Sequence, residues 1–344
     1  MRLTLNDVAR EAGVSTATVD RVLNNRSGVR GRTREIVVDT ARRLGYISES
    51  PGNGYEPSAA GELAPIRLDF VLPEGANMFI RTLQRQLEGQ AATRQGLDVR
   101  VWPIEGFNPD RLAGALAELE GRAQGVGVIA LDHPTVREAI RRLSEAGVKV
   151  VTLASDILHV PRLAYIGIDN RAAGRLAGFV LGRFLGAGER RKVALFAGSL
   201  SYRGHEEREM GFRHIVKEEF PDLEVVELRE MRDDEETAFW EAGQLLERHR
   251  DLAGIYNVGA GNEGIARALK ANPTTQRIVY VAHELTAHNR ARLLEGALDA
   301  VIDQNPRVEA REALNILTQS VRGLPYDYHP PRLQIIFREN IPET

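Results

Sequence analysis

The chain has 344 residues, of which 43% are apolar, so it can bury a sizeable core and is expected to form two or three domains. It contains no cysteine, which excludes disulfides and thiolate metal sites within the chain and suits a reducing compartment. The first residues lack the apolar core of a signal peptide, and no window reaches the roughly 18 apolar residues of a membrane span. We therefore expect a cytoplasmic protein without membrane contact.

Charge is distributed unevenly along the chain. Residues 1–45 carry nine arginines against five acids, a net charge of +4, whereas the whole chain carries −3 and the remainder therefore −7. A small basic segment before a larger acidic one predicts that the N-terminal part meets a polyanion. Chance clustering of surface arginines explains the charge alone equally well, so the residue pattern must decide.

Three short helices are predicted at the N-terminus. Thr4 begins a capping-box-like start of the first, Gly13 permits the turn after it, and Ser15 can cap the second. A third helix over 31–44 stops at Gly45. Apolar spacing gives the second helix one buried face, formed by Val19, Val22 and Leu23. Two helices joined by a glycine turn, with a third beside them, predict a helix-turn-helix unit whose second helix fits a DNA major groove about 12 Å wide.

These residues resemble the headpiece of the LacI/GalR family of bacterial transcription regulators. The resemblance rests on "LTLNDVAREAGVSTATVDRVLNN", "TREIV" and "ARRLGY", over about 45 residues. It implies contacts to base edges from Thr16, Ala17 and Arg21, of which Arg21 can bond guanine O6 and N7 together, whereas Ala17 can make only apolar contact. It also implies phosphate contacts, which position the head without specifying sequence, from Thr4, Ser15, Asn24 and Thr33.

Two features depart from the family pattern. Asp20 stands where the family usually has Ser, and because its charge would be repelled by a phosphate we assign it no phosphate contact; it could pair with a nearby Arg or accept from a cytosine amine. After "LGY" the family has a hinge helix that inserts leucines into the minor groove, whereas Pro51, Gly52 and Gly54 break helices here. Residues 47–65 are expected to form a linker, with a displaced hinge helix bearing Leu63 as the alternative.

From Ile66 onward, strand-like apolar runs alternate with amphipathic helical segments. This alternation with short loops predicts parallel sheets with helices on both faces, and the number of strands suggests two sheets. The eleven strand-like runs are 66–73, 97–104, 125–132, 149–154, 164–169, 192–198, 223–230, 252–258, 277–282, 298–303 and 332–337.

Polar residues gather where the predicted strands end. Ligands of open parallel sheets bind outside the carboxyl ends of the strands, and acids and amides there suit a ligand rich in hydroxyl groups. Phe79 or Tyr202 could stack on an apolar ring face. The alternative for each polar residue is that it caps the following helix. The strand-end residues are Glu74, Asn77, Asp132, His133, Ser155, Asp156, Asp169, Asn170, Ser201, Tyr202, Asn257, Glu284, Asp303 and Gln304.

The part after the linker resembles the periplasmic-binding-protein-like core of the same family, through "YIGIDNRAAGRLAG", "REMGF" and "DQNP". The resemblance implies two α/β lobes joined by three crossings, one lobe of about 66–168 and 304–323 and the other of about 169–303 and 324–344. It implies effector contacts from Arg208, Asn257, Glu284 and Gln304, with Glu284 replacing a commoner Asp. With the strand-end residues, the expected effector contacts are Asn77, Phe79, Asp132, Asp156, Tyr202, Arg208, Asn257, Glu284 and Gln304.

Two motifs suggest enzymes instead. "GAGNEG" (259–264) follows a strand and opens a helix, as a dinucleotide-binding loop does, but it lies at the eighth predicted strand rather than the first, and a lone G-x-G-x-x-G is weak evidence. "HELTAH" places His283 and His288 five residues apart, about 140° around a helix, which does not suit a zinc site. We therefore expect no catalytic residue, cofactor or metal, and an NAD-binding oxidoreductase or a sugar-binding receptor remain alternatives.

The residues and the resemblance together predict a sequence-specific DNA-binding transcription regulator. The expected protein is a homodimeric repressor of a carbohydrate or polyol utilisation operon. Its partners would be double-stranded operator DNA and a small hydroxyl-rich effector that controls it allosterically. The effector's identity, its sign and the operator sequence stay open.

Overall fold

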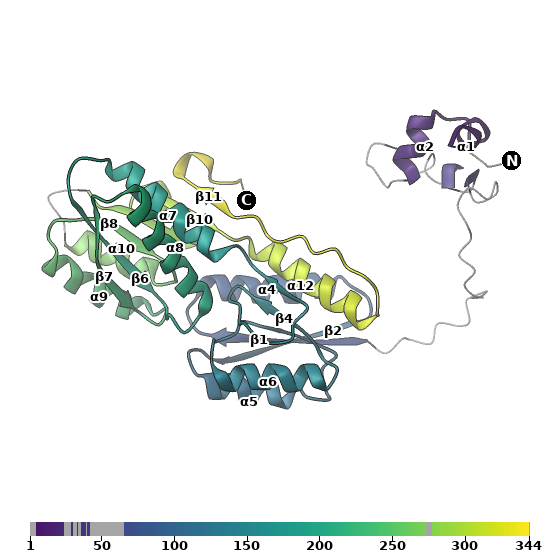
Figure 1. The fold of residues 1–344 in the computed structure, drawn as a ribbon, viewed down its shortest axis with the longest axis horizontal. Helices are drawn as coiled ribbons and strands as arrows, with labels where there is room; N and C mark the ends of the chain where they lie inside the picture. The colour runs from purple at the N-terminus through teal and green to yellow at the C-terminus, as the bar shows by residue number, and fades with distance from the viewer. Residues whose placement is uncertain are drawn as a thin grey trace. The chain divides into compact units, whose positions relative to one another are not determined.

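The computed structural model describes residues 5–23, 29, 33, 36–38, 40–41, 65–272 and 277–343 (Figure 1). The chain divides into two compact units, Met1–Leu63 and Ala64–Thr344. In the described part of the chain, no helix combines the length and the apolar character needed to cross a membrane.

The N-terminal unit contains helices α1 (Leu5–Glu11) and α2 (Thr16–Leu23). Gly13 between them has a φ of 66°, the left-handed backbone that its turn requires. Ser15 caps α2, because its hydroxyl accepts the backbone N–H of Thr18 at 3.2 Å. A small core forms from Val8, Ala9, Val19, Val22, Val37 and Ala41, all buried.

The rest of the predicted head is described only in part. Thr33, residues 36–38 and residues 40–41 are helical, while the other residues of the predicted third helix lie outside the described part, so that helix stays a prediction. Thr4, Asn24 and the predicted linker up to residue 64, including Leu63, also lie outside it.

The first sheet of the larger unit has the order β2–β1–β3–β4–β5, and all of its neighbouring strands run parallel. Its strands are β1 (Ile66–Glu74), β2 (Leu97–Glu105), β3 (Gly125–Val128), β4 (Lys149–Leu153) and β5 (Ala164–Ile166). Figure 1 shows α5 (Pro109–Glu118) and α6 (Pro134–Glu145) on one face, and α4 (Met78–Ala92) and α12 (Pro306–Val321) on the other. Burial of Leu68, Phe70, Leu83 and Leu317 between these layers forms one continuous apolar core.

The second sheet has the order β11–β10–β9–β8–β6–β7. Its strands are β6 (Arg191–Ala197), β7 (Leu223–Glu230), β8 (Leu252–Asn257), β9 (Val279–His283), β10 (Ala300–Asp303) and β11 (Gln334–Ile336). One face packs on α7 (Asn170–Leu185) and α8 (Arg203–Glu219), and the other on α9 (Glu235–Arg248) and α10 (Asn262–Ala271). The remaining elements are α11 (Ala287–Glu295) and a short 3₁₀ helix, η1 (Arg338–Asn340).

The chain passes between the two sheets three times: from β5 into α7, from β10 into α12, and from α12 back to β11. Each strand of the described part overlaps one predicted run, and the α/β core with parallel-sheet lobes is confirmed. The expectation of parallel strands is wrong at one position. Strand β11 runs antiparallel to β10, pairing Val301 with Ile336, because it enters at the sheet edge from the other lobe rather than through a crossover helix of its own.

Helices α7 and α8 approach each other closely because glycines face the contact. A Cβ added to Gly174 on α7 would lie 1.9 Å from the carbonyl oxygen of Arg208, and one added to Gly211 on α8 would lie 2.1 Å from that of Arg171. This approach fixes the position of α8, and therefore of Arg208, relative to the second sheet.

Candidate functional site

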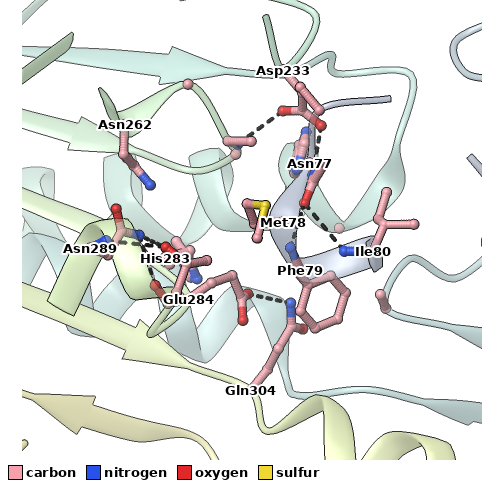
Figure 2. Close-up of a pocket in the computed structure, with 18 of the residues that line it drawn as sticks. Asn77, Met78, Phe79, Ile80, Asp233, Asn262, His283, Glu284, Asn289 and Gln304 are labelled. Atoms are coloured by element: carbon pink, nitrogen blue, oxygen red, sulfur yellow. Dashed lines mark hydrogen bonds between the residues drawn. The ribbon is translucent and has the colours of Figure 1, made fainter. Parts of the chain in front are cut away.

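A cavity lies between the two sheets, at the carboxyl ends of their strands (Figure 2). It offers about 90 Å³ to the centres of water molecules, several times the ~10–15 Å³ that one water needs. The first lobe contributes the start of α4, from Asn77 to Ile80, and the second contributes the start of α8 and the loops after β7, β8 and β9. Gln304, in the crossing between β10 and α12, lines it as well.

Arg208 is 4% exposed and its guanidinium is held on three sides. Its Nε donates to Asn170 Oδ1 at 2.8 Å, Nη1 to the carbonyl oxygen of Val258 at 2.8 Å, and Nη2 to Gln304 Oε1 at 3.3 Å. These acceptors fix the plane of the fork. Each terminal nitrogen has a second N–H, so the group retains donors for a ligand.

Gln304 connects Arg208 to Glu284, because its side-chain oxygen accepts from Arg208 and its side-chain nitrogen donates to Glu284. Gln304 Nε2 donates to Glu284 Oε1 at 2.5 Å, while Glu284 Oε2 is buried without a hydrogen-bond partner. Burial, reinforced by the neighbouring Asp303 carboxylate, raises the pKa of Glu284 to about 8. At neutral pH this carboxyl is therefore largely protonated.

The backbone at Glu284 is also unusual. Its φ is 69°, a left-handed value that costs a non-glycine residue energy and that occurs often at functional sites. Asn289 holds this conformation by donating from Nδ2 to the carbonyl oxygens of His283 at 2.9 Å and Glu284 at 2.7 Å. Figure 2 shows both bonds beside the cavity.

A bond between two side chains is one of several hydrogen bonds that join the lobes beside the cavity, another being that from Gly204 N–H to Ser155 Oγ at 3.2 Å. Asn77 Nδ2, at the start of α4, donates to Asp233 Oδ2 at 2.8 Å, and Asp233 lies in the loop after β7 (Figure 2). Asp233 Oδ1 accepts the backbone N–H of Ala260 at 2.9 Å. The Arg232 guanidinium also lies 5.5 Å from the ring centre of Phe107, a further contact between the lobes. The structure is thus a closed arrangement.

Two buried histidines complete the polar wall. Burial lowers the pKa of His205 and, more strongly, that of His283, so both are neutral at pH 7. His283 Nε2 lies 2.8 Å from the Tyr256 hydroxyl, and its Nδ1 has no hydrogen-bond partner although the residue is 1% exposed. His288 also lines the cavity, but the described residues contain no cluster of three or more side chains able to hold a metal ion.

Comparison with known proteins identifies both parts of the chain. The "Periplasmic binding protein domain" family model matches residues 68–325, and the model for "Bacterial regulatory proteins, lacI family" matches residues 4–49. The chain belongs to the periplasmic binding protein domain family and carries a lacI-family domain. Both resemblances found in the sequence are confirmed.

Several relatives are regulators by name. Catabolite control protein A of Priestia megaterium is 30% identical over 173 residues, which are 50% of this chain and 49% of that protein. The HTH-type transcriptional regulator DegA of Bacillus subtilis is 23% identical over 255 residues, 74% of this chain and 72% of its own. The chain spans about half the length of catabolite control protein A and of several other curated relatives that it matches.

Solved structures support the same fold. GanP, a glucose-galactose binding protein from Geobacillus stearothermophilus, superposes with a TM-score of 0.74 at 22% identity. The superposition covers 81% of this chain and 99% of GanP. At this identity the likeness establishes the periplasmic-binding-protein fold of the two lobes.

Six of the nine residues expected to contact an effector line the cavity of the periplasmic binding protein domain: Asn77, Phe79, Tyr202, Arg208, Glu284 and Gln304. Three do not. Asp132 pairs with Arg137, and Asp156 pairs with Arg162 at 2.5 Å. Asn257 is fully buried behind the wall, where it donates to the carbonyl oxygen of Ala260 and to Asn262 Oδ1, both at 2.7 Å.

Several lining residues escaped the sequence prediction, above all His205, Asp233, Glu235, His283 and Asn289. Asp233 follows the strand-like run 223–230 by three residues, which is only a weak signal because its placement depends on the backbone of that loop. His283 is the last residue of β9 itself. Nothing in the sequence marks a buried imidazole at that position.

Packing and backbone conformation require two of the glycines of "GAGNEG". Gly261 caps α10 with a φ of 85°, and a Cβ on Gly264 would lie 2.0 Å from the carbonyl oxygen of Glu235. The Glu235 carboxylate accepts the backbone N–H of Gly264 at 2.7 Å. An acid of the chain thus occupies the helix start where a dinucleotide would place its pyrophosphate.

In the lacI-family domain, Thr16, Ala17 and Arg21 are exposed on α2, as base contacts must be, and Thr33 is half-buried. Ser15 is exposed, and its hydroxyl lies 2.8 Å from that of Thr18. The DNA contacts of these residues stay predictions.

Proposed function

We propose that the chain is a sequence-specific DNA-binding transcription regulator, a repressor whose operator affinity is set by a hydroxyl-rich small molecule in the cavity. The observation that carries this proposal is the union of a lacI-family domain with a two-lobed core whose cavity presents a guanidinium, carboxyls and amides. The relatives' names, which are those of regulators rather than enzymes, support it. DNA binding would place its action in the cytoplasm.

The contacts that we propose with the effector come from the residues expected from the sequence that line the cavity, with Arg208, Glu284 and Gln304 at their centre. Amides and carboxyls bond hydroxyl groups in both directions, and Phe79 and Tyr202 add apolar surface. The domain division proposed is a head of 1–46, a linker of 47–65 and a two-lobed remainder. A homodimer is proposed because two heads would match a pseudo-palindromic operator.

Regulation would follow from linkage. An effector that binds only the closed lobes shifts the population toward them, and operator affinity changes by the coupling free energy, typically about 1–3 kcal/mol or ~5–150-fold. GanP is by name a glucose-galactose binding protein, which supports sugars as the first compounds to test. A carbohydrate or polyol utilisation operon would then be the regulated target.

The test measures fluorescence anisotropy of labelled DNA from upstream of the gene, titrated with the intact protein at several salt concentrations. We expect binding about 10³-fold or more tighter than to scrambled DNA, with affinity falling steeply as salt rises. A thermal-shift screen of sugars, polyols and nucleotides, with and without that DNA, would find the effector. Equal affinity for upstream and scrambled DNA, or stabilisation by NAD alone, would refute the proposal.

A further inference from the structure

The cavity carries an excess of negative charge. Glu263 pairs with Arg292 at 3.1 Å, but the other three carboxyl side chains form no ion pair within the described residues. Arg208, the one guanidinium among the lining residues, keeps its charge because it bonds neutral acceptors, and it offsets one of the three carboxyls. The histidines of the wall, whose pKa values burial lowers, add no positive charge. Such a surplus in a partly dehydrated cavity attracts a cation. The four carboxyl residues of the wall are Asp233, Glu235, Glu263 and Glu284.

Only one of the three unpaired carboxyls has a buried oxygen waiting for a donor. Both oxygens of Asp233 accept hydrogen bonds, and Glu235 caps the start of α10. Glu284 is bonded through Oε1 alone, and its Oε2 is buried with no partner. A buried polar atom without a partner is costly, so a ligand donor at Oε2 would be strongly favoured.

A second unpartnered atom lies next to it in sequence. His283 Nδ1 is buried on the same wall, while its other ring nitrogen is bonded to Tyr256. Figure 2 shows Glu284, His283 and Gln304 on one side of the cavity and Asp233 with Asn77 on the other. The left-handed backbone of Glu284, held by Asn289, fixes the carboxyl in this place before any ligand arrives.

We propose that the ligand of this cavity is a polyhydroxylated amine, such as an amino sugar or an amino polyol, whose ammonium group binds Glu284. The proposal rests on the proposed function in one respect, that the cavity is the effector site. A neutral sugar would satisfy Oε2 with a hydroxyl but would leave the charge surplus in place. An ammonium group donates a hydrogen bond to Oε2 and also offsets the negative charge, because it is a donor and a cation at once.

Binding of an amine has a consequence that binding of a neutral sugar lacks. The titratable groups around Glu284 are Asp303 on β10, Arg208 on α8 and Glu309 on α12, with His283 neutral beside it, and burial raises the pKa of Glu309 well above its usual range. Burial and Asp303 raise the pKa of Glu284 to about 8. An adjacent ammonium favours the ionised carboxylate, so the amine should release close to one proton on binding at pH 7.

The experiment is isothermal titration calorimetry of the intact protein with matched pairs: glucosamine and glucose, galactosamine and galactose, mannosamine and mannose, and 1-amino-1-deoxysorbitol and sorbitol. N-acetylglucosamine, in which an uncharged amide replaces the amine, serves as the control. We expect at least one amine to bind about tenfold or more tighter than its parent, which is ~1.4 kcal/mol, and its heat to differ between phosphate and Tris buffers as proton release requires. The buffer comparison needs no variant.

Glu284→Gln keeps the shape but cannot ionise when the amine binds, so it should abolish the preference for the amine. Glu219→Gln, the same change at the exposed end of α8, should retain it. The proposal fails if the parent sugar or the N-acetylated sugar binds as tightly as the amine or more tightly. It also fails if Glu284→Gln keeps the preference for the amine. Absence of binding by every compound at about 10 mM, a limit far weaker than micromolar affinity, would overturn it as well. Operator affinity measured on the same samples separates the two proposals. If a neutral sugar alters operator affinity, the amine proposal fails and the proposed regulation stands. If an amine binds without altering operator affinity, the proposed regulation fails and the amine proposal stands.

Discussion

Replacing Asn77 with Asp should weaken effector binding by opening the bond between the lobes while leaving α4 intact. Asn77 has two roles: its Oδ1 accepts the backbone N–H groups of Phe79 and Ile80 at 3.0 and 3.4 Å, and its Nδ2 donates to Asp233 at 2.8 Å. Asp is as good an N-cap as Asn, so Asn77→Asp preserves the first role. It destroys the second, because two carboxylates then face each other.

The size of the effect follows from the two terms. A lost hydrogen bond of this kind costs about 1 kcal/mol, and two unit charges at about 4 Å repel by another ~1 kcal/mol even with the screening of bulk water. Both terms act only on the closed arrangement. If closure is required for binding, a total of about 2 kcal/mol lowers effector affinity by roughly 30-fold.

The assay is calorimetry with the tightest compound of the sugar and amine panel, and the decisive variant is the exchange Asn77→Asp with Asp233→Asn. There the amide and carboxylate trade places, so the cross-lobe bond is possible again while the cap is kept, and affinity should return to within a few-fold of the original. Asn108→Asp is the matched control, since Asn108 caps α5 through Asp110 and Arg111. If Asn77→Asp binds normally, or if the exchange fails to restore binding while both variants fold, the bond does not govern closure.

Three further predictions test other parts of the molecule. Arg21→Ala should cost roughly 1–3 kcal/mol at one base position of each half-site; anisotropy titrations that show the same loss on operator and scrambled DNA would contradict a base contact. The pKa of Glu284 rises from 4.5 to about 8 in the folded protein, so the folded state binds more protons and its stability falls as pH increases through that interval. Glu284→Gln should flatten this slope in thermal unfolding between pH 5 and pH 8, and parallel curves for the two proteins would show that the group does not titrate as argued. Gly174→Ala should push α7 away from α8 and lower the free energy of unfolding by about 1–3 kcal/mol, which lowers Tm by ~2–4 °C per kcal/mol. It should also weaken ligand binding, because Arg208 moves with α8. Gly114→Ala on α5, with open space around its Cβ, should leave both stability and binding nearly unchanged.

The strands were predictable because each is a short run rich in apolar residues, and central strands such as β3 and β8 are buried along their whole length. Leu68 and Phe70 on β1 are completely buried, and Gly125 and Gly127 on β3 leave the room those two side chains occupy. Such runs do not encode strand direction. The antiparallel setting of β11 follows from the third crossing, which depends on how α12 packs on the first sheet and has no local signature.

The cavity was only partly predictable, and the differences have local causes. Asp132 and Asp156 follow buried strands as several cavity-lining residues do, but arginines five and six residues later pair with them. Asp233 was missed because its placement depends on backbone conformation: Arg232 and Asp233 have φ values of 51° and 57°, which a sequence of ordinary residues does not announce. Left-handed turns therefore decide which strand-end acids reach the cavity.

The position of Arg208 links the cavity to the crossings that must bend when the lobes move. Its Nε bonds Asn170, the first residue after the crossing into α7, and its Nη2 bonds Gln304, which lies in the crossing into α12. Gln304 in turn holds Glu284. A ligand that bonds Arg208 and Glu284 therefore changes the strength of hydrogen bonds to Asn170 and Gln304, which lie at two of the three connections between the lobes. If these bonds change when the lobes open, such a ligand has the differential affinity that a population shift requires. A ligand held by the outer rim of the cavity alone would lack it, however tightly it bound.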